Sequence, residues 1–284
     1  MLGTIIGDIA GSYLEVLEVI DKKQKGIRDY KDRIKILDNN TSLFNDECSV
    51  TDDSILTIAI MDAILNNKDY GTCLKEYGLK EINLGLDRYG RSRFGPGFMS
   101  WLQGNSKGDS YGNGCAMRIA PVGYLFDTLE DVKRESYLAT IPTHNNPDSI
   151  KCAEAVATSI FFLRHGMSKV ELIEYITRYY FKLDYDLEDL RHNYIFTSKA
   201  IDSVPQAIFC FLKSYSFESA IRTALSIGGD TDTIACITGS IAEAYYGIPN
   251  EIIEDVNKYI PDYMKDILEL FGNSKIVENC IETC

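Results

Sequence analysis

Two short segments of this 284-residue chain combine neighbouring carboxylates with hydroxyl groups. The first is Thr51-Asp52-Asp53-Ser54 and the second is Gly228-Gly229-Asp230-Thr231-Asp232-Thr233. Carboxylate and hydroxyl oxygens, with neither Cys nor His nearby, are the hard ligands that suit Mg²⁺ or Mn²⁺. Two such cations about 3.5–4 Å apart can clamp the oxygens of a substrate and activate a water molecule. The two clusters therefore predict a site for two divalent cations, whose charge the four aspartates would balance.

Each cluster also has a simpler interpretation. Thr, Ser and Asp are preferred N-cap residues, and acidic side chains in a first turn suit the helix dipole. A cap needs one acceptor, however, whereas each cluster offers two carboxylates and contains no Lys or Arg. Ionised carboxylates beside buried helices are costly without a counter-charge. The combination favours cation binding over capping alone.

The segments that follow the two clusters must position these carboxylates. Residues 55–65 and 234–246 are apolar nearly all round. A helix without a polar face is normally buried inside a larger protein. We therefore expect two buried helices that carry both acidic clusters to one place.

Helix signals dominate the rest of the chain. Asn146-Pro147 opens a helix that Gly166 ends, which is the expected asymmetry of proline and glycine. Ser168 and Glu171 form a capping box for the next helix. Alternating strand patterns are scarce, and only residues 191–198 are interpreted as a short extended stretch. The pattern predicts an all-α protein.

Composition restricts the partners and the compartment. The net charge of −13 argues against nucleic acid and against an anionic membrane surface. The apolar runs are too short to cross a bilayer. Eight cysteines without a CxxC pair predict a reducing cytoplasm rather than a disulfide framework. Because no linker or low-complexity tract divides the chain, residues 1–284 are expected to form a single domain.

Five motifs resemble those of the ADP-ribosylglycohydrolase family, in the same order along the chain. They are Gly7-Asp8-x-x-Gly11-x-x-x-Glu15, Thr51-Asp52-Asp53, Gly112-Asn113-Gly114-x-Ala116-Met117-Arg118, Thr143-His144 and Gly228-Gly229-Asp230-Thr231-Asp232-Thr233. The resemblance extends from residue 3 to about 250. It implies an all-α orthogonal multi-helix bundle, a pair of Mg²⁺ or Mn²⁺ ions, and hydrolysis of the bond between ADP-ribose and an acceptor.

The acceptor and the activity are less closely defined than the family. The resemblance favours ADP-ribosyl-arginine on a protein as the substrate. One alternative is a hydrolase of a free conjugate such as O-acetyl-ADP-ribose. Another is a noncatalytic ADP-ribose-binding or structural relative, although such a protein has no need of so many carboxylates.

The resemblance also assigns roles to the acidic residues. The implied metal ligands are Thr51, Asp52, Asp53, Asp230, Asp232 and Thr233. Asp53 or Asp232 would take a proton from the attacking water, and the choice between them stays open. The resemblance implies that Glu15, a third catalytic residue, contacts a metal or the substrate from a mobile loop; the simpler interpretation is an exposed acid beside a turn. Because Glu15 follows a glycine-rich turn (Gly7, Gly11), we hypothesise that it acts as a gate. For Asp8 the resemblance gives no definite role, and capping or supporting the first helix is the simpler interpretation.

The remaining assignments concern the substrate. The glycine-rich loop around Asn113 and Gly114 is suited to cradle a pyrophosphate by its backbone N–H groups. Arg118 is expected either to contact phosphate or to pair with a structural acid. His144 is assigned to the diphosphate or the ribose. Phe94 and Tyr111 are candidates for stacking on adenine.

Overall fold

The computed structural model describes residues 1–24, 30–87 and 90–273, without the side chains of residues 18–24. Its helices are α1 (Leu2–Gln24), α2 (Tyr30–Lys35), α3 (Asp52–Leu65), α4 (Tyr70–Leu84), α5 (Pro96–Leu102), α6 (Gly114–Met117), α7 (Ala120–Leu125), α8 (Leu129–His144), α9 (Pro147–Arg164), α10 (Lys169–Tyr179), α11 (Leu187–Asn193), α12 (Ala200–Lys213), α13 (Phe217–Ile227), α14 (Thr231–Tyr246), α15 (Asn250–Val256), the 3₁₀ helix η1 (Asn257–Tyr259) and α16 (Asp262–Gly272). In these ranges β pairing is limited to two isolated bridges. The predicted all-α fold is confirmed.

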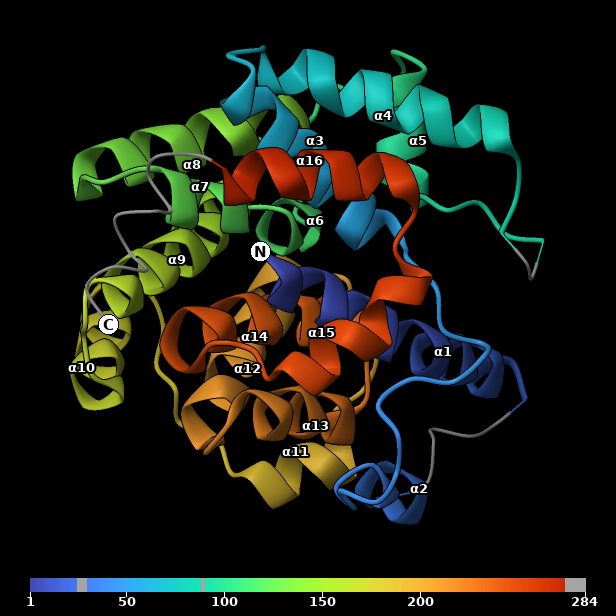
Figure 1. The fold of residues 1–284 in the computed structure, drawn as a ribbon, viewed down its shortest axis with the longest axis vertical. Coiled ribbons are helices and arrows are strands. Elements are labelled where there is room, and N and C mark those ends of the chain that lie inside the picture. Colours follow the sequence, from blue (N-terminus) through green and yellow to red (C-terminus); the bar gives the residue numbers. More distant parts are fainter. Residues whose placement is uncertain (25–29, 88–89, 274–284) are drawn as a thin grey trace.

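Two helices lie at the centre of the fold, as the apolar runs predict. Every residue of α3 from Asp53 to Ala63 is buried, and so is every residue of α14 from Thr231 to Ala242. Helix α14 packs against α1, α9, α12 and α13. Helix α16, the last described helix, packs on α3 (Figure 1). The acidic N-termini of α3 and α14 are therefore held inside the protein.

Helices α1 and α14 cross at very short range. A Cβ atom on Gly7 would lie 2.0 Å from the carbonyl oxygen of Ala235, and one on Gly11 would lie 2.4 Å from Cα of Asp232. Only glycine lets the two backbones approach this closely. The expected glycine-rich turn is therefore wrong: both glycines lie inside α1, and they bring this helix onto the N-terminal half of α14.

The local helix signals are mostly confirmed. Asn146 caps α9, and Ser168 with Glu171 forms the capping box of α10. The extended stretch at 191–198 is wrong for its first three residues, because Asp186 caps a helix that continues through Asn193. The rest of the stretch runs beside the glycine-rich loop, where Ser198 accepts a hydrogen bond from the backbone of Asn113 (2.8 Å).

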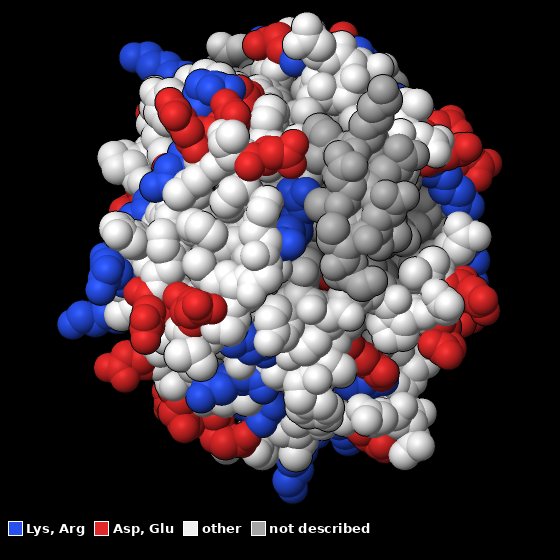
Figure 2. Space-filling view, turned by 60° about the vertical axis from the view of Figure 1, so that its left-hand side comes forward, with Lys and Arg blue, Asp and Glu red and all other residues white. Residues whose placement is uncertain are grey.

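One cluster of buried apolar side chains extends from Met1 to Met264. This shared core supports the single-domain organisation, which stays a prediction. No described helix is both long enough and apolar enough to cross a membrane. On the face drawn in Figure 2, the described acidic and basic side chains are interspersed.

Candidate metal centre

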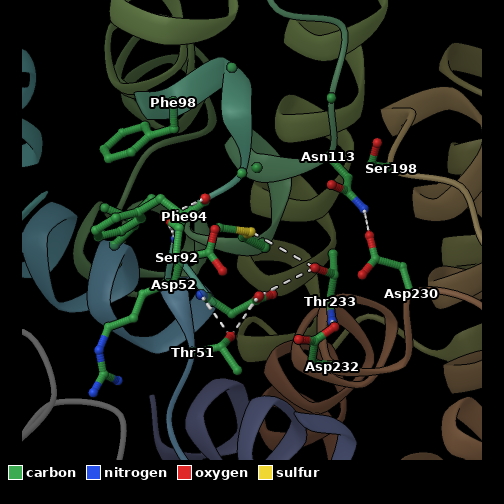
Figure 3. Close-up of a pocket in the computed structure, with 18 of the residues that line it drawn as sticks. Thr51, Asp52, Ser92, Phe94, Phe98, Asn113, Ser198, Asp230, Asp232 and Thr233 are labelled. Atoms are coloured by element: carbon green, nitrogen blue, oxygen red, sulfur yellow. Dashed lines mark hydrogen bonds between the residues drawn. The ribbon is translucent and has the colours of Figure 1, made fainter. Parts of the chain in front are cut away.

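A cavity of about 850 Å³ opens between α1, the N-termini of α3 and α14, and the glycine-rich loop before α6. Every side chain that the sequence assigns to metal, catalysis or substrate lines this one cavity. Figure 3 shows Thr51 and Asp52 facing Asp230, Asp232 and Thr233, with Asn113 above Asp230. The structure therefore brings together residues separated by up to 218 positions, while their roles stay predictions.

Two overlapping groups of carboxylates lie at this cavity. Carboxylate oxygens of Asp8, Asp53 and Asp232 lie within 4.8 Å of one another, and the same holds for Glu15, Asp230 and Asp232. Asp232 belongs to both groups. Carboxylates at this spacing offer oxygen ligands to two neighbouring cations.

Asp8 has a larger part in the site than the sequence suggested. It lies inside α1, so it does not cap that helix. Its carboxylate instead accepts hydrogen bonds from the backbone N–H groups of Thr51 (3.0 Å) and Ser54 (3.1 Å), at the start of α3. The missed signal was the spacing of Asp8 and Glu15, because seven residues are two helical turns and place both on one face.

The N-terminus of α3 has a capping residue, Thr51, and a carboxylate, Asp53, with one oxygen that accepts no hydrogen bond from the described residues. Thr51 caps the helix by accepting from the N–H group of Asp53 (3.3 Å). Thr233 donates its hydroxyl to Oδ2 of Asp53 (3.3 Å). The other oxygen, Oδ1, is buried and has no hydrogen-bond partner among the described residues. A buried acceptor without a donor is costly, and a bound cation would satisfy it.

Capping does not explain Asp230. It occupies the N-cap position of α14, yet its side chain makes no capping hydrogen bond. Its Oδ2 instead accepts from the side-chain amide of Asn113 at 2.8 Å (Figure 3). Asn113, expected to contact substrate, therefore also orients one of the candidate ligands.

Burial and mutual repulsion shift the carboxylates away from their ordinary ionisation. Burial, followed by neighbouring carboxylates, raises the pKa of Asp52 to about 8 and that of Glu15 to about 7. The same causes raise the pKa of Asp53 and of Asp232 well above the usual range. Protons therefore offset part of the negative charge in the metal-free protein. Divalent cations fit this oxygen-rich site because they would replace those protons.

We expect the metal-free protein to lose thermal stability as the pH rises from about 5 to about 8. The folded state binds more protons than the unfolded state between the ordinary and the raised pKa values, so each rise in pH favours unfolding. Melting temperatures in EDTA across this range test the expectation. Asp232→Asn should make the melting temperature fall less steeply with pH, because it removes one titrating carboxylate. A melting temperature that rises with pH in EDTA would contradict it.

Glu15 reaches the site from a regular helix. Helix α1 continues through Gln24, so the expected mobile loop is wrong. The Glu15 carboxylate lies 3.5 Å from Nη1 of Arg91, which also contacts Asp87 through Nε (2.9 Å). Arg91 thus supplies a cation at the cavity that no sequence motif indicated.

Arg118 and His144 lie beneath the glycine-rich loop. Nη2 of Arg118 donates to the hydroxyl of Thr143 at 2.5 Å. The same hydroxyl lies 2.6 Å from Nδ1 of His144. Among the described residues Arg118 forms no ion pair, and its Nε and Nη1 have no hydrogen-bond partner. Burial, helped by Arg118, holds the pKa of His144 well below its usual range. His144 is therefore neutral. Its ring packs close to Gly114, since a Cβ atom there would lie 3.3 Å from the ring.

The two aromatic candidates differ in exposure. Phe94 is buried and packs against Phe98 with ring centres 4.9 Å apart, at the side of the cavity opposite Asn113 (Figure 3). Tyr111 is 61 % exposed at the rim. Phe94 offers a fixed apolar wall, whereas Tyr111 can reach a ligand from solvent.

The fold and the site together define an all-helical protein with acidic side chains from three helices around one cavity. The sequence model described as ADP-ribosylglycohydrolase matches residues 1–278, and the chain belongs to this family. The resemblance inferred from the motifs is thereby confirmed.

Two relatives and one solved structure are similar to this chain. ADP-ribosylhydrolase ARH3 of Bos taurus is 25 % identical over 87 % of this chain and 84 % of its own length. ADP-ribosylarginine hydrolase Tri1 of Pseudomonas putida is 25 % identical over 54 % of this chain and 44 % of its own. A structure titled "ADP-ribosylglycohydrolase-related protein complex" superposes with a TM-score of 0.66 and 19 % identity, covering 94 % of this chain and 93 % of that one. This last likeness concerns the fold alone.

Proposed function

We propose that this protein is a metal-dependent hydrolase that releases ADP-ribose from an ADP-ribosylated acceptor, with arginine on a protein as the preferred acceptor. The observation that carries the proposal is the pair of carboxylate groups that share Asp232, in which every member but the half-buried Glu15 is buried. The names of ARH3 and Tri1 describe hydrolysis of ADP-ribose linkages, and that of Tri1 specifies arginine.

The proposed cation ligands come from both acidic clusters. They are Thr51, Asp52, Asp53, Asp230, Asp232 and Thr233. Of these, Asp53, Asp230 and Asp232 belong to the two carboxylate groups, which the geometry completes with Asp8 and Glu15, whereas Asp52 lines the cavity outside both groups. Two bound Mg²⁺ or Mn²⁺ ions would supply Lewis acidity to ribose hydroxyls and to a water molecule. The ligand set contains only oxygens, in keeping with the preference of both metals.

The chain's own carboxylates would then move the proton. Water attacks the anomeric carbon of the ribose, the bond from that carbon to the acceptor breaks, and its electron pair leaves with the acceptor nitrogen. Asp53 or Asp232 accepts the proton that the water loses. Asp53 retains an unpartnered oxygen, whereas Oδ1 of Asp232 accepts from the backbone of Thr233 at 2.9 Å. Both stay candidates for the base.

The proposed contacts to ADP-ribose lie on two sides of the cavity, with the glycine-rich loop on one side and Phe94 on the other (Figure 3). The N–H groups of Gly112 and Asn113 already donate to Ser110 and Ser198, so the proposed backbone contact to the diphosphate falls to Gly114. Arg118 adds positive charge beneath this loop. Phe94 and Tyr111 are the proposed adenine contacts.

A release assay tests the proposal. Purified protein is offered arginine-, serine- and O-acetyl-linked ADP-ribose with Mg²⁺ or Mn²⁺, and free ADP-ribose is measured. We expect release from the arginine conjugate that EDTA abolishes. Release from the O-acetyl conjugate alone would refute the proposed acceptor. No release from any conjugate would favour a noncatalytic protein that binds ADP-ribose.

Loss of Glu15 is expected to reduce turnover more than cation affinity. The four aspartates of the two clusters would still hold the cations, but the side chain facing Asp230 and Arg91 would no longer adjust when substrate enters. We expect Glu15→Gln to lower kcat about 10- to 100-fold, as loss of a supporting group at a metal site does. Calorimetric Mn²⁺ affinity and kcat are measured together. A large loss of affinity with kcat preserved at saturating metal would make Glu15 an ordinary ligand.

A further inference from the structure

Arg33 is a fully buried cation in a segment that matches none of the family motifs. It lies in the short helix α2, and its side chain is 0 % exposed. Its Nη1 group donates to the backbone carbonyl oxygens of Ile227 (2.7 Å), Tyr194 (3.0 Å) and Arg191 (3.2 Å). Burying a guanidinium is costly unless hydrogen bonds compensate for the lost water. These three hydrogen bonds provide that compensation, and the question is what the buried charge does at this place.

The three carbonyls belong to the ends of two helices. Ile227 is the last residue of α13, Arg191 lies in the last turn of α11, and Tyr194 is the C-cap of α11. Carbonyl groups at a helix C-terminus lack partners within the helix and carry partial negative charge. One guanidinium from α2 therefore caps two helices at once.

Both helix ends lead directly to the candidate metal centre. Gly228 follows α13 with φ of 74°, and a Cβ atom there would lie 2.5 Å from Cζ of Arg33. A Cβ atom on Gly229 would lie equally close, at 2.5 Å, to the ring of Tyr194. Asp230 comes next in the chain. The guanidinium and the tyrosine ring thus enclose the two-glycine turn that aims the Asp230 carboxylate.

The same unit reaches the glycine-rich loop. Asp230 accepts from the side-chain amide of Asn113, and the backbone of Asn113 donates to Ser198 in the segment that follows Tyr194. Arg33 contacts Tyr194, whose ring lies against Gly229 next to Asp230, and the segment after Tyr194 contacts Asn113. Arg33 is therefore connected to both members of the Asp230–Asn113 hydrogen bond. Nothing in this chain of contacts involves α3, which carries the other acidic cluster.

We infer that Arg33 is a positioning residue that acts through Asp230, fixing the Gly228-Gly229 turn so that this carboxylate points into the cavity. The inference rests on the proposed role of Asp230 as a cation ligand. It gives a function to α2, which packs against α11 and α13.

The test compares two buried arginines. Arg222, on α13, also donates to backbone carbonyls, those of Ile36 (2.7 Å) and Thr41 (2.6 Å), and pairs with Glu218. These contacts do not include the Gly228-Gly229 turn. Arg222→Met is therefore the matched control for Arg33→Met. Amide hydrogen exchange of residues 228–232 and calorimetric Mn²⁺ affinity are measured for both variants and for Arg33→Lys.

We expect Arg33→Met to accelerate exchange at residues 228–232 at least about tenfold and to weaken Mn²⁺ binding about 10- to 100-fold. Arg33→Lys should fall between this variant and the wild type, because a lysine ammonium keeps the charge but lacks the planar fork. Arg222→Met should lower the melting temperature and leave both other quantities within about twofold of the wild type.

Equal exchange and equal Mn²⁺ affinity in Arg33→Met and the wild type would overturn the inference and make Arg33 a purely structural residue. If Arg33→Met does not fold, the same comparison with Arg33→Lys decides. A wild-type protein that binds no Mn²⁺ would contradict the proposed function instead, and the exchange data would still decide whether Arg33 fixes the turn.

Discussion

Asp53→Asn and Asp232→Asn are each expected to reduce hydrolysis below about one hundredth of the wild-type rate and to raise the melting temperature of the metal-free protein. Loss of a group that merely supports a metal ligand already costs 10- to 100-fold, so loss of a ligand or base should cost more. The stabilisation arises because each change removes a buried carboxylate whose neighbours disfavour its charge. Release of arginine-linked ADP-ribose and melting in EDTA are measured together.

Asp62→Asn is the matched control for these variants. Asp62 is also a buried aspartate of α3, but its carboxylate accepts hydrogen bonds from Lys68 (2.9 Å) and Asn66 (2.6 Å). These bonds hold its pKa below the usual range although burial opposes them. Asp62→Asn should therefore lower the melting temperature and preserve turnover. Near-normal turnover in Asp53→Asn or Asp232→Asn would remove that residue from the proposed mechanism.

Gly7→Ala and Gly11→Ala are expected to destabilise the fold by about 3 kcal/mol or more, the upper end of the range for overpacked cores. The added methyl group meets the backbone of α14 at 2.0–2.4 Å, and a backbone cannot rotate away as a side chain can. Separating α1 from α14 also moves Asp8 and Glu15 away from Asp232. Cation affinity should therefore fall in any variant that folds. Urea unfolding and calorimetry measure both effects.

Gly272→Ala provides the comparison. Gly272 is the last residue of α16, where an added Cβ atom meets nothing within 4 Å. Alanine favours a helix by up to about 1 kcal/mol over glycine, so this variant should be as stable as the wild type or more stable. Wild-type stability in Gly7→Ala would contradict the close crossing of α1 and α14.

Local sequence patterns were sufficient for several features of this protein. The apolar runs after the two acidic clusters predicted the buried helices α3 and α14, because a helix without a polar face needs protein on every side. Capping signals located the starts of α9 and α10. The types of the ligands, carboxylate and hydroxyl, were enough to propose Mg²⁺ or Mn²⁺ before any geometry was known.

The contribution of α1 could not be predicted in the same way. Glycines at positions 7 and 11 fit either a turn or a close helix crossing, and the local sequence does not distinguish them. The partners that decide between these alternatives, Ala235 and Asp232, lie more than 200 residues away. For this reason the sequence predicts a mobile loop for Glu15 and leaves Asp8 with a role in capping or supporting the first helix.

The role of Arg33 also depends on contacts with residues that are remote in the sequence. The residues around it match none of the family motifs, and only folding places its guanidinium against the ends of α11 and α13. Residue patterns along a chain report what lies within one or two helical turns. The sequence by itself therefore determined the buried helices α3 and α14 and the types of oxygen-bearing side chain at their N-termini, whereas the tertiary structure decided which remote side chains join them at the site, because those contacts depend on where separate helices meet.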